Sequence, residues 1–253
     1  MAGPSDIEWT EHTWNPVAGC DIISPGCSNC YAMRMARRLE LMGHKKYQNL
    51  TRISGGRPKW NGKISLDYEA LEAPKSWRNG KLIFVNSMSD LFHEDVPFDF
   101  IEDVFKTMEA TPQHTYQVLT KRAERLATLA PKISWPKNVW MGVSVENSDY
   151  LYRIELLRTV NAAIRFLSLE PLLGPLPNLD LTAINWVIAG GESGPNARPM
   201  DPEWARSIRD TCAAYRVPFH FKQWGGVNKK KTGRMLDSRT WDEFPTLLST
   251  AAE

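Results

Sequence analysis

Short apolar runs alternate along the chain with segments in which apolar residues recur at helical spacing. The runs are rich in branched and aromatic residues, as a strand buried on both faces requires. We predict strands at the strongest of these runs, which are 82–85, 116–120, 139–145, 165–169, 186–189 and 218–221. Two weaker candidates, 13–17 and 63–66, come earlier in the chain.

The segments between these runs predict four helices, because their apolar residues share one face. The first ends near Gly43, the second ends before Pro112, Ser148 caps the third, and Asp201 followed by Pro202 begins the fourth. Their inward faces are Ala32, Met35, Ala36 and Leu39; Phe98, Ile101, Phe105 and Met108; Leu151, Ile154 and Leu157; and Trp204, Ile208 and Cys212. The polar, glycine-containing and basic stretches 48–60 and 227–237 predict loops.

Strands that alternate with helices favour parallel βαβ units and the α/β class. The number of strands in 253 residues predicts a full or partial (β/α) TIM-like barrel. It would have about 6–8 parallel strands, with an open doubly wound sheet as the alternative. No domain boundary is evident, so we predict a single (β/α) domain over residues 1–253.

Three cysteines, Cys20, Cys27 and Cys30, lie in one loop after the first candidate strand. Their C-x6-C-x2-C spacing lets three thiolates reach one metal or cluster, and three ligands leave one coordination position open. A closed structural zinc site would need a fourth Cys or His, and neither His12 nor His44 has zinc-motif spacing. An iron–sulfur cluster needs no fourth protein ligand if a substrate or cofactor occupies the last iron.

Composition and charge indicate the cellular compartment in which this loop works, but they do not indicate its function. The formal net charge of +2 names no partner. No signal-like N-terminal segment or apolar run of membrane-spanning length is present, so we expect a cytoplasmic protein without a membrane partner. In that reducing compartment a cysteine cluster favours metal binding over disulfides. The fourth cysteine, Cys212, is on an apolar helix face and predicts a core residue.

Polar side chains follow six successive predicted strands at the point where each strand ends. Because α/β enzymes place their chemistry at these carboxyl ends, the six clusters together favour one site. Ser144 and Glu146, like Ser168 and Glu170, alternate with apolar neighbours, so we expect each pair to point into the same mouth. The six clusters are Asn86-Ser87-Met88-Ser89-Asp90, Thr120-Lys121-Arg122, Ser144-Val145-Glu146-Asn147, Ser168-Leu169-Glu170-Pro171, Gly190-Gly191-Glu192-Ser193-Gly194 and Lys222-Gln223-Trp224-Gly225.

The cysteine loop, the strand–helix alternation and the Gly-Gly-Glu sequence at 190–192 resemble the radical S-adenosylmethionine (SAM) enzymes. The first cysteine gap is longer than that family's C-x3-C-x2-C, and Asn29 stands where an aromatic is usual, with Tyr31 as its substitute. The chain is also similar to the phage Gp37/Gp68 family, also called the three-Cys-motif family, which is regarded as radical-SAM-like. That similarity covers the segments 14–16, 30–32, 86–92, 119–122, 168–174, 190–194 and 221–225.

The resemblance implies a [4Fe–4S] cluster on Cys20, Cys27 and Cys30, with SAM on the open iron and a 5′-deoxyadenosyl radical formed from it. Position at the strand ends then suggests a division of roles. The predicted cofactor-binding residues are Tyr31, Asn86, Ser87, Ser89, Ser144, Glu146, Gly190, Gly191 and Glu192. The predicted catalytic, substrate-facing residues are Asp90, Lys121, Glu170, Lys222 and Gln223.

The resemblance to these families also implies two partners, an electron donor and a separate partner protein of the three-Cys-motif family. Nucleic acid or a nucleotide is the expected substrate, for modification or repair, because basic sequences can bind phosphates. These sequences are Lys45-Lys46 and Lys229-Lys230-Lys231 with Arg234. A run of three lysines is also what an ordinary solvated loop carries.

Two other classes of function stay open. A zinc-bearing barrel hydrolase or nuclease would use Asp90, Glu146, Glu170 and Glu192 as metal ligands or bases, although histidines are scarce at the strand ends. A non-catalytic iron–sulfur module would bind or sense redox state together with a partner protein. Metal content separates the radical enzyme from the zinc enzyme, and SAM cleavage separates it from the binding module.

Overall fold

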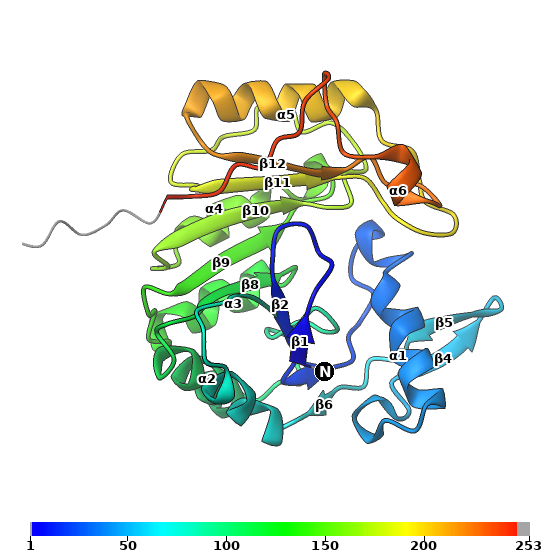
Figure 1. Ribbon diagram of the computed structural model, residues 1–253, viewed down its shortest axis with the longest axis vertical. Helices are drawn as coiled ribbons and strands as arrows, with labels where there is room; N and C mark the ends of the chain where they lie inside the picture. The colour runs from blue at the N-terminus through cyan, green and yellow to red at the C-terminus, as the bar shows by residue number, and fades with distance from the viewer. Residues whose placement is uncertain (1, 247–253) are drawn as a thin grey trace, which may run out of the picture.

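One sheet of eight strands organises the computed structural model, which describes residues 2–246 (Figure 1). The first two strands in the sheet pair antiparallel, and every other neighbouring pair is parallel. The chain is therefore mixed α/β with a mostly parallel sheet. In spatial order the strands are β1 (Ala2–Pro4), β2 (His12–Trp14), β7 (Leu82–Val85), β8 (Thr115–Thr120), β9 (Val139–Ser144), β10 (Ile164–Leu169), β11 (Trp186–Gly190) and β12 (Phe219–Gln223).

Helices connect most of the successive parallel strands, but residues 170–185 between β10 and β11 contain no helix. The α-helices are α1 (Tyr31–Leu41), α2 (Phe98–Glu109), α3 (Ala123–Leu129), α4 (Tyr152–Arg158), α5 (Pro202–Tyr215) and α6 (Lys229–Thr232). The 3₁₀ turns are η1 (Pro25–Cys27), η2 (Lys45–Tyr47), η3 (Glu69–Ser76), η4 (Ala130–Lys132) and η5 (Ser148–Tyr150). Figure 1 shows α5 lying along β11 and β12, and α4 contacts β9 and β10. None of the helices in residues 2–246 is long and apolar enough to cross a membrane.

The two faces of the sheet carry different cores. The larger core joins strand residues such as Val118 to helix residues such as Val104, Leu157 and Ile208. Cys212 of α5 is fully buried in this core, as its helical position predicts. The opposite face carries an aromatic-rich cluster with no helix in it, formed by Trp9, Phe84, Trp140, Ile164, Phe166, Trp186 and Ile188. Trp9 reaches this cluster from the loop between β1 and β2, which covers part of that face (Figure 1).

The six strong strand predictions are confirmed, and the α/β class is confirmed with them. Seven strands, from β2 to β12, run parallel to one another. A closed barrel is not shown, because residues 2–246 record no pairing between β12 and either β1 or β2. The cysteine loop follows β2, the first parallel strand, as expected.

The two weak strand predictions are wrong in extent. The segment 13–17 divides into β2 and a separate two-residue strand, β3 (Val17–Ala18), because Pro16 has no N–H to continue the ladder. From 63–66 only β6 (Ser65–Leu66) forms, and it pairs with β3 outside the main sheet.

Two predicted loops contain regular structure. Within 48–60, β4 (Thr51–Ser54) and β5 (Arg57–Trp60) form an antiparallel hairpin. Its turn needs two left-handed residues, which Gly55 and Gly56 supply with φ of 57° and 70°. Within 227–237, the short helix α6 interrupts the predicted loop.

The helix predictions hold with one shift. Asp201 caps α5 by accepting a hydrogen bond from the Glu203 backbone N–H. The third predicted helix begins later than Ser148, because η5 comes first and α4 starts at Tyr152. Asn147 supplies the cap there, since its side chain accepts from the Asp149 backbone N–H.

Candidate functional site

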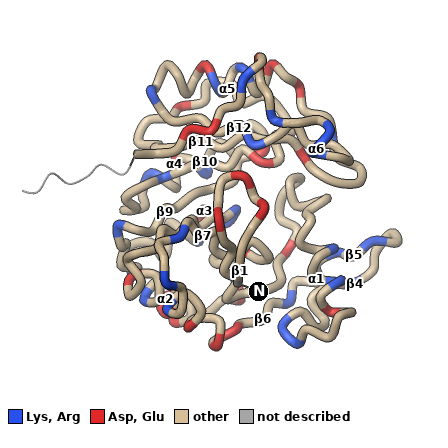
Figure 2. The backbone as a smooth tube through the Cα atoms, viewed as in Figure 1, with Lys and Arg blue, Asp and Glu red and all other residues tan. Residues whose placement is uncertain are grey.

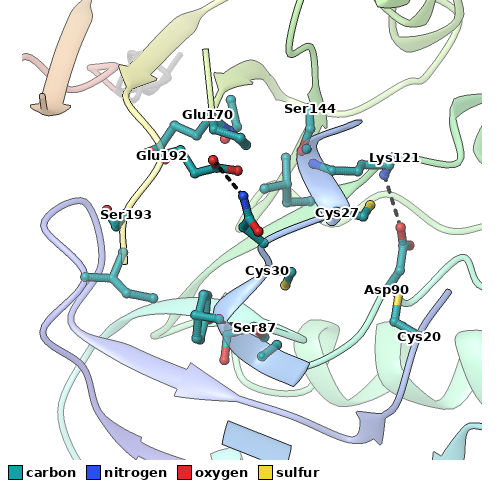
Figure 3. Close-up of a pocket in the computed structure, with 18 of the residues that line it drawn as sticks. Cys20, Cys27, Cys30, Ser87, Asp90, Lys121, Ser144, Glu170, Glu192 and Ser193 are labelled. Carbon is teal, nitrogen blue, oxygen red and sulfur yellow. Dashed lines mark hydrogen bonds between the residues drawn. The ribbon is translucent and has the colours of Figure 1, made fainter. Parts of the chain in front are cut away.

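A cavity of about 630 Å³ opens where the parallel strands end, and the cysteine loop forms part of its wall (Figure 3). The six strand-end clusters all contribute side chains to it, as their position predicts. All of the predicted site residues except Glu146 and Gly190 line this cavity. Trp9, Phe84 and Leu119 add an apolar surface that the strand-end pattern did not reveal.

The cysteine loop is a series of tight turns. The Cys27 backbone N–H donates to the Ser24 carbonyl at 3.0 Å, and the Cys30 N–H donates to the Cys27 carbonyl at 3.2 Å. Helix α1 then begins directly after Cys30. Cys20, Cys27 and Cys30 are all free thiols and all line the cavity. In Figure 3 Cys27 and Cys30 lie close to the centre of the group, and Cys20 lies beside Asp90.

Burial keeps the thiols of Cys20 and Cys30 protonated in the metal-free protein. Burial raises the pKa of Cys20 to about 12, with further contributions from Asp90 and from the other two thiols. Arg122 opposes that rise, and its Nη1 lies 3.8 Å from the Cys20 sulfur. Burial also raises the pKa of Cys30. Because a bound metal displaces thiol protons, these groups are suited to ligation rather than to free-thiolate chemistry.

The donor set is suited to an iron–sulfur cluster. Soft thiolates select such clusters, and the three thiols lie near enough to one another for their charges to interact. Within residues 2–246, no three His, Cys, Asp or Glu side chains form a group that could hold a metal ion. The three cysteines that hold a [4Fe–4S] cluster each bind a different iron, so they lie farther apart than three ligands of one ion.

Glu146 does not face the cavity, and the prediction that it does is wrong. Strand β9 ends at Ser144, so the alternation of faces no longer holds two residues later. The fully buried Glu146 carboxylate instead accepts from Ser24 Oγ at 2.5 Å and from Arg153 Nη1 at 3.0 Å, with Lys121 Nζ at 3.3 Å. Ser24 Oγ also lies 3.5 Å from the Cys27 sulfur. Glu146 therefore holds the cysteine loop against the end of β9.

Gly26 makes this contact possible. A Cβ atom at this position would lie 2.5 Å from Glu146 Oε1, closer than real Cβ atoms come. Only glycine lets the loop pass so near the carboxylate. Gly190 on β11 likewise allows a close approach, since a Cβ there would lie 2.7 Å from Glu170 Oε1. Both glycines shape the site, and Gly26 also lines the cavity.

Glu192 lines the cavity, but its carboxylate already has internal partners. It accepts from the Arg198 backbone N–H at 2.9 Å, from Arg198 Nε at 3.0 Å and from Asn29 Nδ2 at 3.0 Å. Burial alone would raise the pKa of Glu192, but these hydrogen bonds outweigh it and the pKa is lowered. Arg198 Nη2 also donates to the Pro25 carbonyl at 2.9 Å. The loop after β11 is thus hydrogen-bonded to the cysteine loop through Arg198, a residue that no sequence pattern indicated.

Asn29 links the cysteine loop to the loop after β11. Its side-chain amide donates to Glu192 Oε2 at 3.0 Å and to the Asn196 carbonyl at 3.2 Å. Tyr31, the expected substitute, lines the cavity and donates to the Ser87 carbonyl at 2.8 Å.

The predicted SAM-binding residues after β7 are engaged with the segment before the cysteine loop. Asn86 Oδ1 accepts from the Val17 backbone N–H at 3.1 Å, and Ser89 Oγ donates to the Val17 carbonyl at 2.9 Å. Ser87 Oγ donates to Asn15 Oδ1 at 3.1 Å. These residues therefore fix the position of the cysteine loop relative to β7, and they line the cavity at the same time.

Predicted catalytic residues are paired across strand ends, from β7 to the neighbouring β8 and from β10 to β12, which lies beyond β11. Asp90 accepts from Thr120 Oγ1 at 2.7 Å, from the Lys121 backbone N–H at 3.0 Å and from Arg122 Nη1 at 3.2 Å. Lys222 Nζ lies 3.1 Å from Glu170 Oε1. Such pairs hold the charges of the cavity wall in fixed positions.

The aromatic wall is tied to the same charges. Trp9 Nε1 donates to Glu170 Oε2 at 3.3 Å. Gln223 donates to the Ser193 hydroxyl across the end of β12. The β1–β2 loop is therefore tied to the end of β10 at the cavity.

Comparisons with known proteins give one family and a group of solved structures. The chain is similar to spore photoproduct lyase complexed with dinucleoside spore photoproduct, at 13% identity and a TM-score of 0.44 over 83% of this chain and 63% of that one. A mutant of that lyase with bound AdoMet and dinucleoside spore photoproduct matches at 14% identity and a TM-score of 0.41, over 79% of this chain and 60% of that one. The chain thus spans less than two thirds of the length of either structure.

A further mutant of the lyase is similar at 13% identity and a TM-score of 0.45, over 85% of this chain and 75% of that one. No curated protein matches the chain. The model of the family described as "Protein of unknown function (DUF5131)" matches residues 4–245, so the chain belongs to this family.

Proposed function

We propose that this protein is an iron–sulfur enzyme of the radical SAM type. One observation carries the proposal: three free cysteines from a single loop share the wall of a cavity of about 630 Å³ at the strand ends. Cys20, Cys27 and Cys30 would hold a [4Fe–4S] cluster, and SAM would take the remaining position on it. When bound and reduced, this pair supplies a 5′-deoxyadenosyl radical that abstracts hydrogen from a substrate.

The chain's own residues contribute charge and position. Lys121 and Arg122 place two cations beside the thiols, which offsets the negative charge of thiolate ligands. Ser144 and Ser168 present hydroxyl groups to the cavity from neighbouring strands. Such groups suit the ribose, amino and carboxylate groups of SAM.

The apolar wall has a separate task. Trp9, Phe84 and Leu119 give part of the cavity an apolar lining, which would disfavour water beside the reacting groups. Exclusion of water protects a reactive species from side reactions. The cofactor performs the difficult chemistry, and the protein binds, orients and shields it.

The finer parts of the proposal concern shape and partners. The seven parallel strands would curve into a partial (β/α) barrel around the cavity. An external electron donor would reduce the cluster, and a separate protein of the three-Cys-motif kind would associate with the chain. The substrate would be nucleic acid or a nucleotide.

Anaerobic reconstitution tests the proposal. Protein loaded with iron and sulfide should show the absorption and electron paramagnetic resonance of a [4Fe–4S] cluster, and it should cleave SAM when reduced. Alanine at Cys20, Cys27 or Cys30 should abolish both signals. Cys212→Ala is the matched control, because Cys212 is a free cysteine in the core and does not line the cavity.

Two results would contradict the proposal in different ways. Protein that retains zinc on the three cysteines and never takes up iron would favour the zinc-dependent hydrolase. Protein that holds the cluster but leaves SAM intact would favour a binding or redox-sensing module.

A further inference from the structure

The segment from α1 to the end of the β4–β5 hairpin and the turn after it is unusually basic. Residues 31–63 contain nine Lys and Arg against a single Glu, an excess of eight positive charges. The whole chain carries +2, so the rest of the chain carries a net charge of −6. We call residues 31–63 the basic arm. Figure 2 shows its blue positions along α1 and out to the tip of the hairpin.

Most cations of the basic arm have no acidic partner. Within residues 2–246, only Arg37 and Lys46 of the nine form ion pairs, with Glu40 and Asp67. Outside the arm, in contrast, 13 of the 22 Lys and Arg pair with an acid of the described chain. Clustered cations without counter-ions repel one another, so the arm favours an anionic partner from outside the chain.

The hairpin arranges its cations on one face. The register places Arg52 opposite Lys59 and Ser54 opposite Arg57, so these four side chains share a face. Like charges directly opposite destabilise a sheet, and Arg52 and Lys59 form such a pair. Ile53 lies on the other face with Pro58. Binding to a membrane interface needs a broad apolar face opposite the basic one. On the other face of this hairpin Ile53 is the exposed large hydrophobic residue and Trp60 is buried, so the exposed apolar surface is small.

The basic arm is also a wall of the cavity. Tyr31, Met35 and Trp60 of the arm line it, and the Lys59 ammonium donates to the Ser28 carbonyl in the cysteine loop. On α1, Arg34 lies against Gly194 in the loop after β11, where a Cβ would come within 2.6 Å of Arg34 Nη2. A polyanion lying along the arm would therefore pass the cavity mouth.

We propose that the basic arm binds the phosphate backbone of a nucleic acid and presents a nucleotide of it to the cavity. A row of cations spread over a helix and a hairpin fits a polymer of phosphates better than a single small anion. Tyr31, whose side chain is exposed and lines the cavity, offers an aromatic surface on which a base stacks.

This proposal moves the expected contact away from the lysines at 229–231. Lys229 is paired with Glu8 at 2.9 Å, which leaves Lys230 and Lys231 as an isolated exposed pair. The inference rests on the proposed function only where it calls the bound polymer a substrate. Binding can be measured on the metal-free full chain, so its failure is distinct from a failure to bind iron or cleave SAM.

Fluorescence anisotropy with a labelled single-stranded DNA and an RNA of the same sequence tests the proposal. Removing two phosphate contacts in Arg52→Ala/Arg57→Ala should lower the slope of log affinity against log salt by about 1.4. The affinity gap to the wild type should then shrink about sevenfold between about 50 and about 200 mM salt. Arg52→Lys/Arg57→Lys should retain most of the binding, which excludes a folding defect as the cause.

The control is Lys230→Ala/Lys231→Ala, which removes the same charge from another exposed segment and should leave affinity and slope unchanged. The proposal is overturned if Arg52→Ala/Arg57→Ala binds both oligonucleotides like the wild type. It is equally overturned if the control loses as much affinity. Binding to phosphatidylserine vesicles without binding to either oligonucleotide would also refute it and would identify a membrane surface as the partner.

Discussion

Replacing Glu146 by glutamine removes one buried charge and keeps the shape of the side chain. Arg153 is 2% exposed, and its Nη1 lies 3.0 Å from Glu146 Oε2. Lys121, 3.3 Å from the other carboxylate oxygen, is more exposed and can turn toward solvent. Arg153 cannot, so Glu146→Gln leaves a buried cation without a counter-ion.

The magnitude follows from that uncompensated charge. Removing one partner of a buried ion pair costs about 3–5 kcal/mol. Arg153 keeps a hydrogen bond to the Ser144 carbonyl at 2.8 Å and its stacking on Tyr150, whose ring centroid is 4.1 Å away. We therefore expect the lower end, about 3 kcal/mol, which lowers the melting temperature by roughly 6–12 °C in a protein of this size.

The assay is thermal and urea unfolding of the metal-free protein, so that cofactor binding does not contribute to stability. Glu155→Gln is the matched control, because Glu155 is exposed and pairs with Arg158 on the surface of α4. It should stay within about 0.5 kcal/mol of the wild type. Glu146→Gln should also take up less iron on reconstitution, because Ser24 and the cysteine loop lose a charged acceptor.

A double-mutant cycle with Arg153→Met decides whether the reasoning is right. The coupling energy between the two positions should reach about 2 kcal/mol, within the range of residues in direct contact. A coupling near zero, or a Glu146→Gln protein as stable as the wild type, would refute the ion pair as the source of the stability.

Three further predictions concern other parts of the fold. Burial lowers the pKa of His220 to about 4, so below about pH 6.5 its imidazole becomes protonated in the unfolded chain but stays neutral in the folded one. Stability should fall by about 3 kcal/mol between those pH values; His220→Gln should remove that part of the dependence, and His44→Gln, at an exposed position, should not. Trp9→Ala should cost about 3–5 kcal/mol in urea unfolding, because it empties the aromatic cluster; an unchanged midpoint would exclude a packing role. Gly26→Ala should lower the free energy of unfolding by about 1–3 kcal/mol, because its Cβ would clash with the Glu146 carboxylate. Gly3→Ala, with open space around it, should melt like the wild type.

The strands and their order along the chain could be predicted from the sequence. Short apolar runs bounded by turn residues indicate buried strands, and the end of each run marks an edge of the sheet. For that reason the six strand-end clusters could be expected to meet, and they do. The position of the cysteine loop after the first parallel strand followed from the same pattern.

The contacts beyond the strand ends could not be predicted in the same way. The alternation of inward and outward side chains predicts the face of a residue only within a strand, and Glu146 lies two residues after the end of β9. Arg198 donates to the Pro25 carbonyl, and no local pattern encodes a partner 173 positions away. The hairpin at 51–60 was missed because its polar, glycine-containing sequence resembles a loop, although the two glycines are what its turn requires.

The three anchors of the cysteine loop lie at very different distances along the chain. Ser28 is held by Lys59, Ser24 by Glu146, and Pro25 by Arg198. During synthesis the thiols therefore leave the ribosome long before the last of their supports, which follows only when about four fifths of the chain has been made. Contacts of such long sequence separation form late in folding. A cluster held by these cysteines would therefore be loaded after all three anchors have been made, and a nascent or truncated chain would present three thiols with no site around them.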